Sequence, residues 1–291
     1  MHARPVARAV AAVLAVGVTL SALAGGGDVL GGLVLRSEDE RLGGLSAVEI
    51  TEGGLGFAAL SDRGFLFVGR ITRDETGRVR ALDIAEPEVL MARNGRRGPR
   101  GARDSEGLAI TDDGELFISY EGDHRVTRRD GAGETILPVA PGWAGLEPNG
   151  SLEALAVDAS GTLYTLPEVS RGPTIPVFRY TGGEWDDSGS IPRSGRFRPV
   201  GADFDDAGRF YLLERDFSLL FGFASRIRRF EVTQAGLTGG AVVWQSAYGT
   251  QPNLEGLSIW RDARGRLIAS MVSDDNYSPF LPSILVEVVL E

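Results

Sequence analysis

One pattern of apolar and polar positions recurs along the chain. An apolar segment is followed by a short turn containing acidic residues and glycine, and then by a second apolar segment. The clearest copy covers residues 104–122, and further copies cover 151–168, 201–214 and 254–274. Such a pattern predicts β-hairpins, and hairpins that repeat every roughly 40–50 residues are typical of a β-propeller, in which each repeat forms one blade.

The remaining apolar segments are expected to supply the outer strands of each blade. A less regular hairpin over 45–62 begins the first blade, whereas the last copy is followed by one further strand over 283–290. The isolated apolar segment 29–35 can complete that blade, because a ring closed by strands from both ends of the chain leaves no exposed sheet edge. We therefore predict an all-β propeller of about five four-stranded blades, with a sixth, degenerate blade in a long connection as the alternative.

The first 24 residues have the features of a signal peptide. Arg4 and Arg8 precede the apolar run Ala9–Leu20, and a small-residue cleavage pattern ends at Ala24. We expect export to a periplasm or to the exterior and a single propeller domain over residues 25–291, with an uncleaved anchor as the alternative. No later apolar run approaches the ~20 residues of a membrane span, so none is expected after cleavage.

Charge and composition narrow the function classes. The sequence has 30 basic and 40 acidic residues, a formal net charge of −10, which disfavours binding to nucleic acid. It contains no lysine, so a Gly-x-x-x-x-Gly-Lys nucleotide loop is excluded. Its two histidines, His2 and His124, cannot form a histidine metal cluster. We expect a monomer that acts on, or binds, a small molecule.

Carboxylates occupy equivalent places in the repeats. The two inner strands of a blade are antiparallel, so the start of the first and the end of the second lie on the same face of the propeller. The acids at these two places, nine in all, are Glu106, Glu153, Asp203 and Glu255 at strand starts, and Asp62, Glu121, Glu168, Glu214 and Asp274 at strand ends. Asp275 and Asn276 extend the last position. We predict that they converge on one mouth of the central channel.

Carboxylates brought together in this way need a positive partner, since like charges disfavour joint ionisation. Ca²⁺ takes six to eight oxygen ligands and is the cofactor that such a ring favours. The residues expected to hold it are Glu106, Glu153, Asp203, Glu255 and Asp274. The alternative to a metal ligand is an acid that only caps a turn by binding backbone amides. For any one of these acids considered alone, that alternative is favoured.

Three further residues are candidates for catalysis beside Glu106. Arg63 and Arg215 each follow a predicted rim acid directly and could steady an anionic group through a guanidinium fork. His124 lies just past Glu121 and could act as a general acid or base, although a surface-loop histidine is an equal alternative. The basic, glycine-rich loop over 91–103 is expected to be solvated; folded over the rim, it could hold an anionic substrate.

Several of these motifs resemble a known family. The matching pieces are Leu60-Ser61-Asp62-Arg63-Gly64, Asp104-Ser105-Glu106-Gly107-Leu108, Leu152-Glu153-Ala154-Leu155, Leu213-Glu214-Arg215, Asn253-Leu254-Glu255-Gly256-Leu257 and Ser273-Asp274-Asp275-Asn276-Tyr277-Ser278. In this order they resemble the bacterial phytase-like family called "esterase-like activity of phytase". The resemblance implies a β-propeller and the hydrolysis of phosphate or carboxylic esters; true β-propeller phytases are calcium-dependent phosphatases.

The favoured function is therefore an exported, Ca²⁺-dependent hydrolase of small anionic esters. One alternative is a non-catalytic binding or scaffold propeller whose metal serves stability. Another is a lactonase-like hydrolase, because lactonase propellers also centre Ca²⁺ on channel acids.

Overall fold

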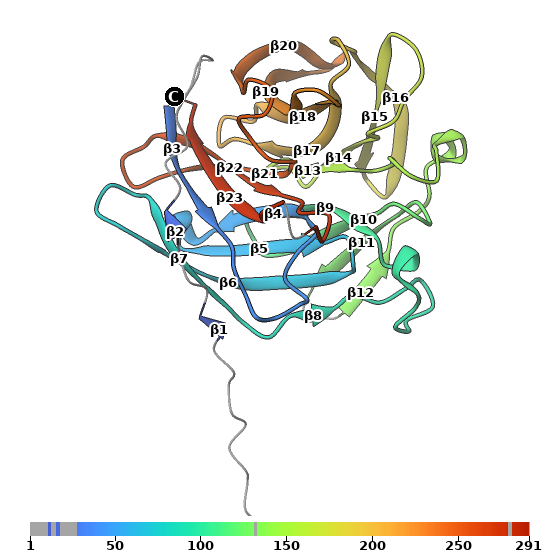
Figure 1. Cartoon of the computed structure of the whole chain (residues 1–291). Coiled ribbons are helices and arrows are strands. Elements are labelled where there is room, and N and C mark those ends of the chain that lie inside the picture. The colour runs from blue at the N-terminus through green and yellow to red at the C-terminus, as the bar shows by residue number, and fades with distance from the viewer. Residues whose placement is uncertain (1–10, 13–15, 18–27, 131–132, 279–280, 291) are drawn as a thin grey trace, which may run out of the picture.

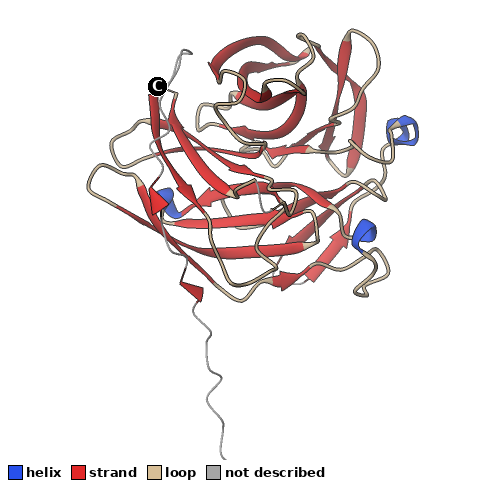
Figure 2. Cartoon of the chain, in the orientation of Figure 1, coloured by secondary structure: helices blue, strands red, loops and turns tan. Residues whose placement is uncertain are grey.

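The computed structural model describes residues 11–12, 16–17, 28–130, 133–278 and 281–290. These residues form five antiparallel sheets arranged around a common axis (Figure 1), with strands and loops almost throughout (Figure 2). The predicted all-β propeller of five blades is confirmed, and the described residues contain no sixth blade. Among them no helix is both long and apolar enough to cross a membrane.

Blades 1 to 4 are built mainly from consecutive strands, named here from the inner edge outward. Blade 1 contains β4 (Leu45–Thr51), β5 (Gly56–Ser61), β6 (Phe65–Arg73) and β7 (Val79–Ile84), with β8 (Glu88–Val89) beside β6 and β1 (Ala11–Ala12) beside β7. Blade 2 contains β9 (Ser105–Ile110), β10 (Leu116–Tyr120), β11 (Arg125–Asp130) and β12 (Gly133–Ile136). Blade 3 contains β13 (Ala154–Val157), β14 (Leu163–Leu166), β15 (Thr174–Thr181) and β16 (Glu184–Pro192).

Blades 4 and 5 complete the ring. Blade 4 contains β17 (Arg198–Phe204), β18 (Phe210–Ser218), β19 (Gly222–Thr233) and β20 (Gly236–Gln245). Blade 5 contains β21 (Leu254–Arg261), β22 (Leu267–Ser273), β23 (Ile284–Val289), β3 (Asp28–Val34) and, at its edge, β2 (Val16–Gly17). The described part of the chain also has three short 3₁₀ helices, which lie in connections: η1 (Glu52–Gly54), η2 (Arg100–Ala102) and η3 (Pro141–Gly145).

The ring closes as the sequence predicts. Strand β3 pairs antiparallel with β23, with Val34 opposite Ile284 and Asp28 opposite Val289. Strands from both ends of the described propeller thus share one sheet. The predicted signal peptide lies mostly outside the described residues, and it stays a prediction.

The core consists of apolar clusters that lie between neighbouring blades. One cluster joins Leu60 of blade 1 to Ile118 of blade 2, and another joins Leu212 of blade 4 to Leu166 of blade 3. The remaining three interfaces are filled in the same way, including the interface between the last blade and the first. Because both faces of a blade are buried, the strands alternate only weakly in sequence.

Glycine allows neighbouring inner strands to approach closely. A Cβ atom added at Gly256 of β21 would lie 2.6 Å from the backbone of Ala47 and Val48 on β4. Gly201 of β17 meets the backbone of β21 in the same manner. The inner strands are thus packed backbone against backbone around the channel.

We expect the substitution Gly256→Ala to destabilise the propeller by about 1–3 kcal/mol, because the added methyl must displace the backbone of β4. The measurement is urea denaturation followed by tryptophan fluorescence. The matched control is Gly145→Ala, because a Cβ atom there meets no described atom within 4 Å and needs no left-handed backbone. Equal stability of the two variants would contradict the close approach.

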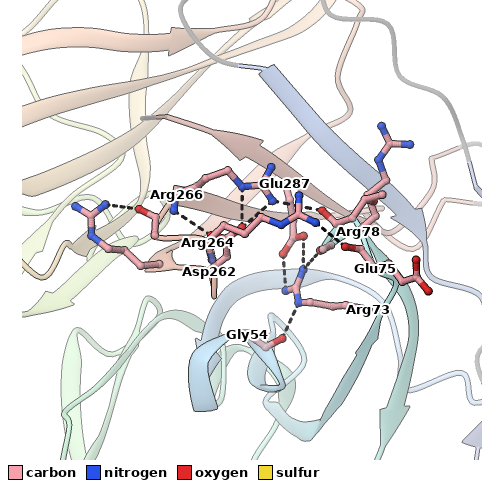
Figure 3. Close-up of polar contacts among 12 residues, drawn as sticks. Gly54, Arg73, Glu75, Arg78, Asp262, Arg264, Arg266 and Glu287 are labelled. Carbon is pink, nitrogen blue, oxygen red and sulfur yellow. Dashed lines mark hydrogen bonds and ion pairs between the residues drawn. The ribbon is translucent and has the colours of Figure 1, made fainter.

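A buried ion pair lies where the last blade meets the first. Arg73 of β6 binds Glu287 of β23 through two hydrogen bonds of 2.6 and 2.8 Å (Figure 3). The Arg73 guanidinium also donates to the Gly54 carbonyl at 2.7 Å and lies 4.6 Å from the ring of Trp260. Beside it, Arg264 donates to the Glu75 carbonyl, so blade 5 holds the β6–β7 hairpin of blade 1 at two places.

Candidate functional site

An acidic cavity of about 370 Å³ opens at one end of the central channel. All five blades contribute to its lining, which contains eight carboxylates and two arginines. Its lining residues are Asp62, Arg100, Gly101, Asp104, Glu106, Glu121, Asn149, Glu153, Glu168, Arg215, Glu255 and Asp274. The structure therefore brings together seven of the carboxylates that the sequence places at the rim, and adds Asp104. The acidic hairpin turns lie around a separate cavity, which has no lining residue in common with this one.

Strand register explains this convergence. In blade 2, Ser105 pairs with Tyr120, and the residues that follow them in the chain, Glu106 and Glu121, reach the mouth of the channel. In blade 5, Leu254 pairs with Ser273, and the residues that follow them, Glu255 and Asp274, reach the same mouth. In blade 4, Pro199 pairs with Glu214, and the corresponding next residues are Val200 and Arg215. In blade 4 an apolar residue and a cation thus occupy the places that Glu106 and Glu121 occupy in blade 2.

The expected rim positions of Asp203 and Glu214 are wrong. Asp203 lies three residues beyond Val200 and lines the cavity of the hairpin turns, where its carboxylate accepts hydrogen bonds from the amides of Ile259 and Phe204 at 2.5 and 2.7 Å. Glu214 is fully buried within blade 4 and binds Arg226 at 2.6 Å and Arg228 at 3.2 Å.

Four other predicted site residues lie outside the lining of the acidic cavity in the described part of the chain. The Arg63 guanidinium stacks on the Tyr277 ring, 2.9 Å from its centroid. His124 Nε2 lies 3.2 Å from the carbonyl of Glu147. Asp275 accepts hydrogen bonds from backbone amides, and Asn276 is exposed. Asn276 lines a neighbouring pocket instead.

Two residues of the cavity were not among the predicted rim acids or cations. Asp104 lies two residues before Glu106, so the period of two along a strand brings both side chains to the same side. One carboxylate oxygen each from Asp104, Glu106 and Glu121 lies within 4.8 Å of the other two. Arg100 belongs to the basic loop over 91–103 and binds Asp62 at 2.5 Å. The loop thus folds over the rim, which is the less favoured of its two sequence interpretations.

Arg215 is the cation in the inner part of the cavity. Its guanidinium donates to Glu168 at 2.9 Å and binds both Glu255 and Asn253. Only 18% of its side chain is exposed, so it offsets part of the negative charge where water is scarce.

Burial and mutual repulsion shift the cavity's carboxyl groups toward their protonated forms. Burial, reinforced by neighbouring carboxylates, raises the pKa of Glu106 and of Glu153 well above the usual range. Burial is likewise the main cause that raises the pKa of Glu255 to about 7 and those of Asp104 and Asp274 to about 6. The protonated forms of these carboxyl groups are therefore populated near neutral pH.

The donors present fit a hard divalent cation. The lining offers carboxylate and amide oxygens, and no sulfur or imidazole ligand among the described residues. Oδ1 of Asp62 is buried and has no hydrogen-bond partner among the described residues, although its other oxygen binds Arg100. An oxygen left in this state is costly unless a cation or a solvent molecule contacts it.

Comparisons with solved structures show the fold. The catalytic domain of the Coprinopsis cinerea GH62 α-L-arabinofuranosidase matches with a TM-score of 0.51 at 12% identity, covering 91% of this chain and 96% of that one. A gluconolactonase from Xanthomonas campestris matches with a TM-score of 0.46 at 12% identity, covering 84% and 72%. The virginiamycin B lyase of Staphylococcus aureus, as a catalytically inactive variant, matches with 0.44 at 10% identity, covering 98% and 96%. Identities this low concern the fold alone.

The comparison by sequence is more specific. No curated protein matches the chain. The family model described as "Phytase-like: Esterase-like activity of phytase" matches residues 40–277, a segment that contains every residue lining the acidic cavity. Since the match covers most of the sequence, the chain belongs to the phytase-like family, as its motifs predicted.

Proposed function

We propose that this protein is an exported hydrolase of small anionic phosphate or carboxylic esters that works with Ca²⁺ in the acidic cavity. The observation that carries the proposal is the convergence of eight carboxylates and two arginines from five blades on one cavity. Membership of the phytase-like family supports the reaction class. The predicted signal peptide supports export.

Asp104, Glu106 and Glu121 would hold the ion, because one carboxylate oxygen from each lies within 4.8 Å of the other two, so that all three can contact one ion. A bound Ca²⁺ would supply positive charge that polarises the ester and favours ionisation of water. Around it, Arg100 is half exposed and can donate to an anionic substrate group as well as to Asp62. Arg215 holds Glu168 and Glu255 in place and thereby keeps the neighbouring wall of the cavity fixed.

Proton transfer is assigned to Glu255. With a pKa of about 7, its carboxyl group is present in both forms near neutral pH, which is the condition under which a general acid or base works well. Burial is the main cause of this shift, and the charge of Arg215 limits it.

Activity should depend on Ca²⁺ and on Glu106. Purified protein is assayed on p-nitrophenyl phosphate, p-nitrophenyl acetate and phytate, with excess Ca²⁺ and with chelator. We expect hydrolysis of at least one substrate, lowered by about 100-fold or more in Glu106→Gln and by chelator, because charge stabilisation of the reacting group is lost. The matched control is Glu231→Gln, an exposed residue of β19, which should retain full activity.

Two outcomes would contradict the proposal. Turnover that is equal in Glu106→Gln and in the unchanged protein would place the reaction elsewhere. A rise in melting temperature with Ca²⁺, without turnover of any ester, would instead indicate a binding or scaffold propeller with a structural metal.

A further inference from the structure

A second cavity adjoins the acidic one. This side pocket has a volume of about 540 Å³ and shares Glu168 and Arg215 with the acidic cavity. Its lining residues are Glu168, Arg196, Arg198, Arg215, Asp216, Phe217, Phe223, Asn253 and Asn276. A molecule bound in one cavity could therefore extend into the other.

Positively charged side chains outnumber negatively charged ones in the side pocket, which is the reverse of the acidic cavity. The side pocket is lined by three arginines and two carboxylates, whereas the acidic cavity is lined by eight carboxylates and two arginines. Arg198 lies directly opposite Arg215 across the β17–β18 pair, an arrangement that is unfavourable for two cations. Glu168 lies 2.9 Å from Arg215 but 3.8 Å from Arg198, whose side chain is 52% exposed. Arg198 is therefore suited to receive an anionic group.

Two phenylalanines give the side pocket an apolar part. The rings of Phe217 and Phe223 lie 4.8 Å apart across the β18–β19 hairpin. From there the hairpin tip continues with Leu219, Leu220 and Phe221, which are 93%, 85% and 64% exposed. Such a row of exposed apolar side chains indicates a binding surface.

The hairpin tip is held in place by the rest of blade 4 and by the connection to blade 5. The amide of Gly249 donates to the Phe223 carbonyl at 2.8 Å, and a Cβ atom added at Gly222 would lie 3.5 Å from the Cα atom of Gly249. The exposed apolar residues thus follow directly in the chain on Phe217 of the pocket and precede Phe223.

We propose that the side pocket binds the non-reacting part of an amphiphilic substrate. Its anionic group would lie at Arg198, and its apolar chain would cover Phe217 and Phe223 and extend toward Leu220. The substrate class of the hydrolase proposed above would accordingly be an ester that combines a negative charge with an alkyl or aryl group. The inference rests on that proposed function for its reaction, but binding in the pocket does not require hydrolysis.

The test is calorimetric binding of two phosphonates that cannot be hydrolysed as esters. Octylphosphonate should bind the unchanged protein at least about tenfold more tightly than methylphosphonate, a difference of about 1.4 kcal/mol that corresponds to burial of roughly two methylene groups. Phe217→Ala and Leu220→Ser should reduce this preference, whereas Arg198→Gln should weaken binding of both ligands. The control is Val242→Ser, an exposed apolar residue on the outer strand β20, which should bind as the unchanged protein does.

The outcomes separate this inference from the proposed function. Glu106→Gln should keep the preference for octylphosphonate even where it has lost hydrolysis, so a failure of the hydrolase proposal leaves this test intact. Equal affinity for the two phosphonates would overturn the inference. It would also be overturned, in favour of docking to a lipid surface, if Leu220→Ser abolished binding to neutral phosphatidylcholine vesicles while octylphosphonate showed no preference.

Discussion

Raising the pH from 5 to 8 in the presence of chelator is expected to lower the free energy of unfolding by about 3 kcal/mol or more. The cause lies in the acidic cavity, where burial raises the pKa of Glu255 to about 7 and those of Asp104 and Asp274 to about 6. The same groups titrate near pH 4 in the unfolded chain. Between these values the folded state binds more protons than the unfolded state, so stability falls as pH rises.

Calcium should oppose this loss, because it replaces the protons that the carboxylates give up. At a free concentration 100-fold above its dissociation constant, a cation that binds only the folded state adds about 2.7 kcal/mol. We therefore expect the difference between Ca²⁺ and chelator to be large at pH 8 and small at pH 5. Urea denaturation at both pH values, with and without Ca²⁺, measures all four free energies.

Two variants locate the effect. The double variant Glu106→Gln/Glu153→Gln removes two carboxylates whose pKa values are raised well above their usual range by burial, so it should flatten the pH dependence and diminish the response to Ca²⁺. The substitution Glu231→Gln, at an exposed residue, should change neither the pH dependence of stability nor the response to Ca²⁺. Stability that increases from pH 5 to pH 8 in chelator would contradict the assignment of the cavity as the source of the pH dependence.

Breaking the ion pair between the last blade and the first is the second large effect. Arg73→Met should destabilise the protein by about 3–5 kcal/mol, because Glu287, whose side chain is only 2% exposed, is left as a buried charge without its cation. Loss of the Arg73 contacts to Gly54 and Trp260 adds to the cost. Denaturation by urea, read from tryptophan fluorescence, gives the difference directly.

The control for this effect is the double variant Arg73→Met/Glu287→Met. Since replacing both partners of a buried pair by apolar residues is often nearly neutral, the second substitution should recover most of the loss. Arg70→Met on the same strand breaks an exposed ion pair with Glu52 and should cost at most about 1 kcal/mol. A loss no larger for Arg73→Met than for Arg70→Met would show that the interface does not depend on the pair.

The fold could be predicted because its repeat is visible in the sequence, whereas individual site residues depended on register. In blade 4 the place of Glu106 and Glu255 is taken by Val200, which is buried in the core, and Asp203 lies three residues farther along β17, where it lines the other cavity. An acid near the start of an apolar segment does not reveal which residue of the strand stands at the rim, and side chains one or three residues apart point to opposite faces of the sheet. The same one-residue distinction separates Glu214, which turns into blade 4, from Arg215, which enters the acidic cavity.

Loop residues were the other place where the structure differs from the sequence-based prediction of the site. Asp62 and Arg63 lie in the tight turn that the hydrogen bond from the Gly64 amide to the Ser61 carbonyl closes, and there the Arg63 guanidinium contacts Tyr277 while Asp62 lines the cavity. Arg100 approaches Asp62 from a loop 38 residues later in the chain. No local pattern predicts that contact, because it depends on how the connection between two blades folds back over the channel mouth.

The pairing of β3 with β23 has a topological consequence. Asp28 stands opposite Val289 on adjacent antiparallel strands, so a tight turn of a few residues would suffice to link them. The two ends of the propeller could therefore be joined by such a turn without any change in the pairing of β3 with β23. A circularly permuted chain, opened in the connection between any two other blades, could form every sheet with its present neighbours and would then build each blade from strands consecutive in sequence.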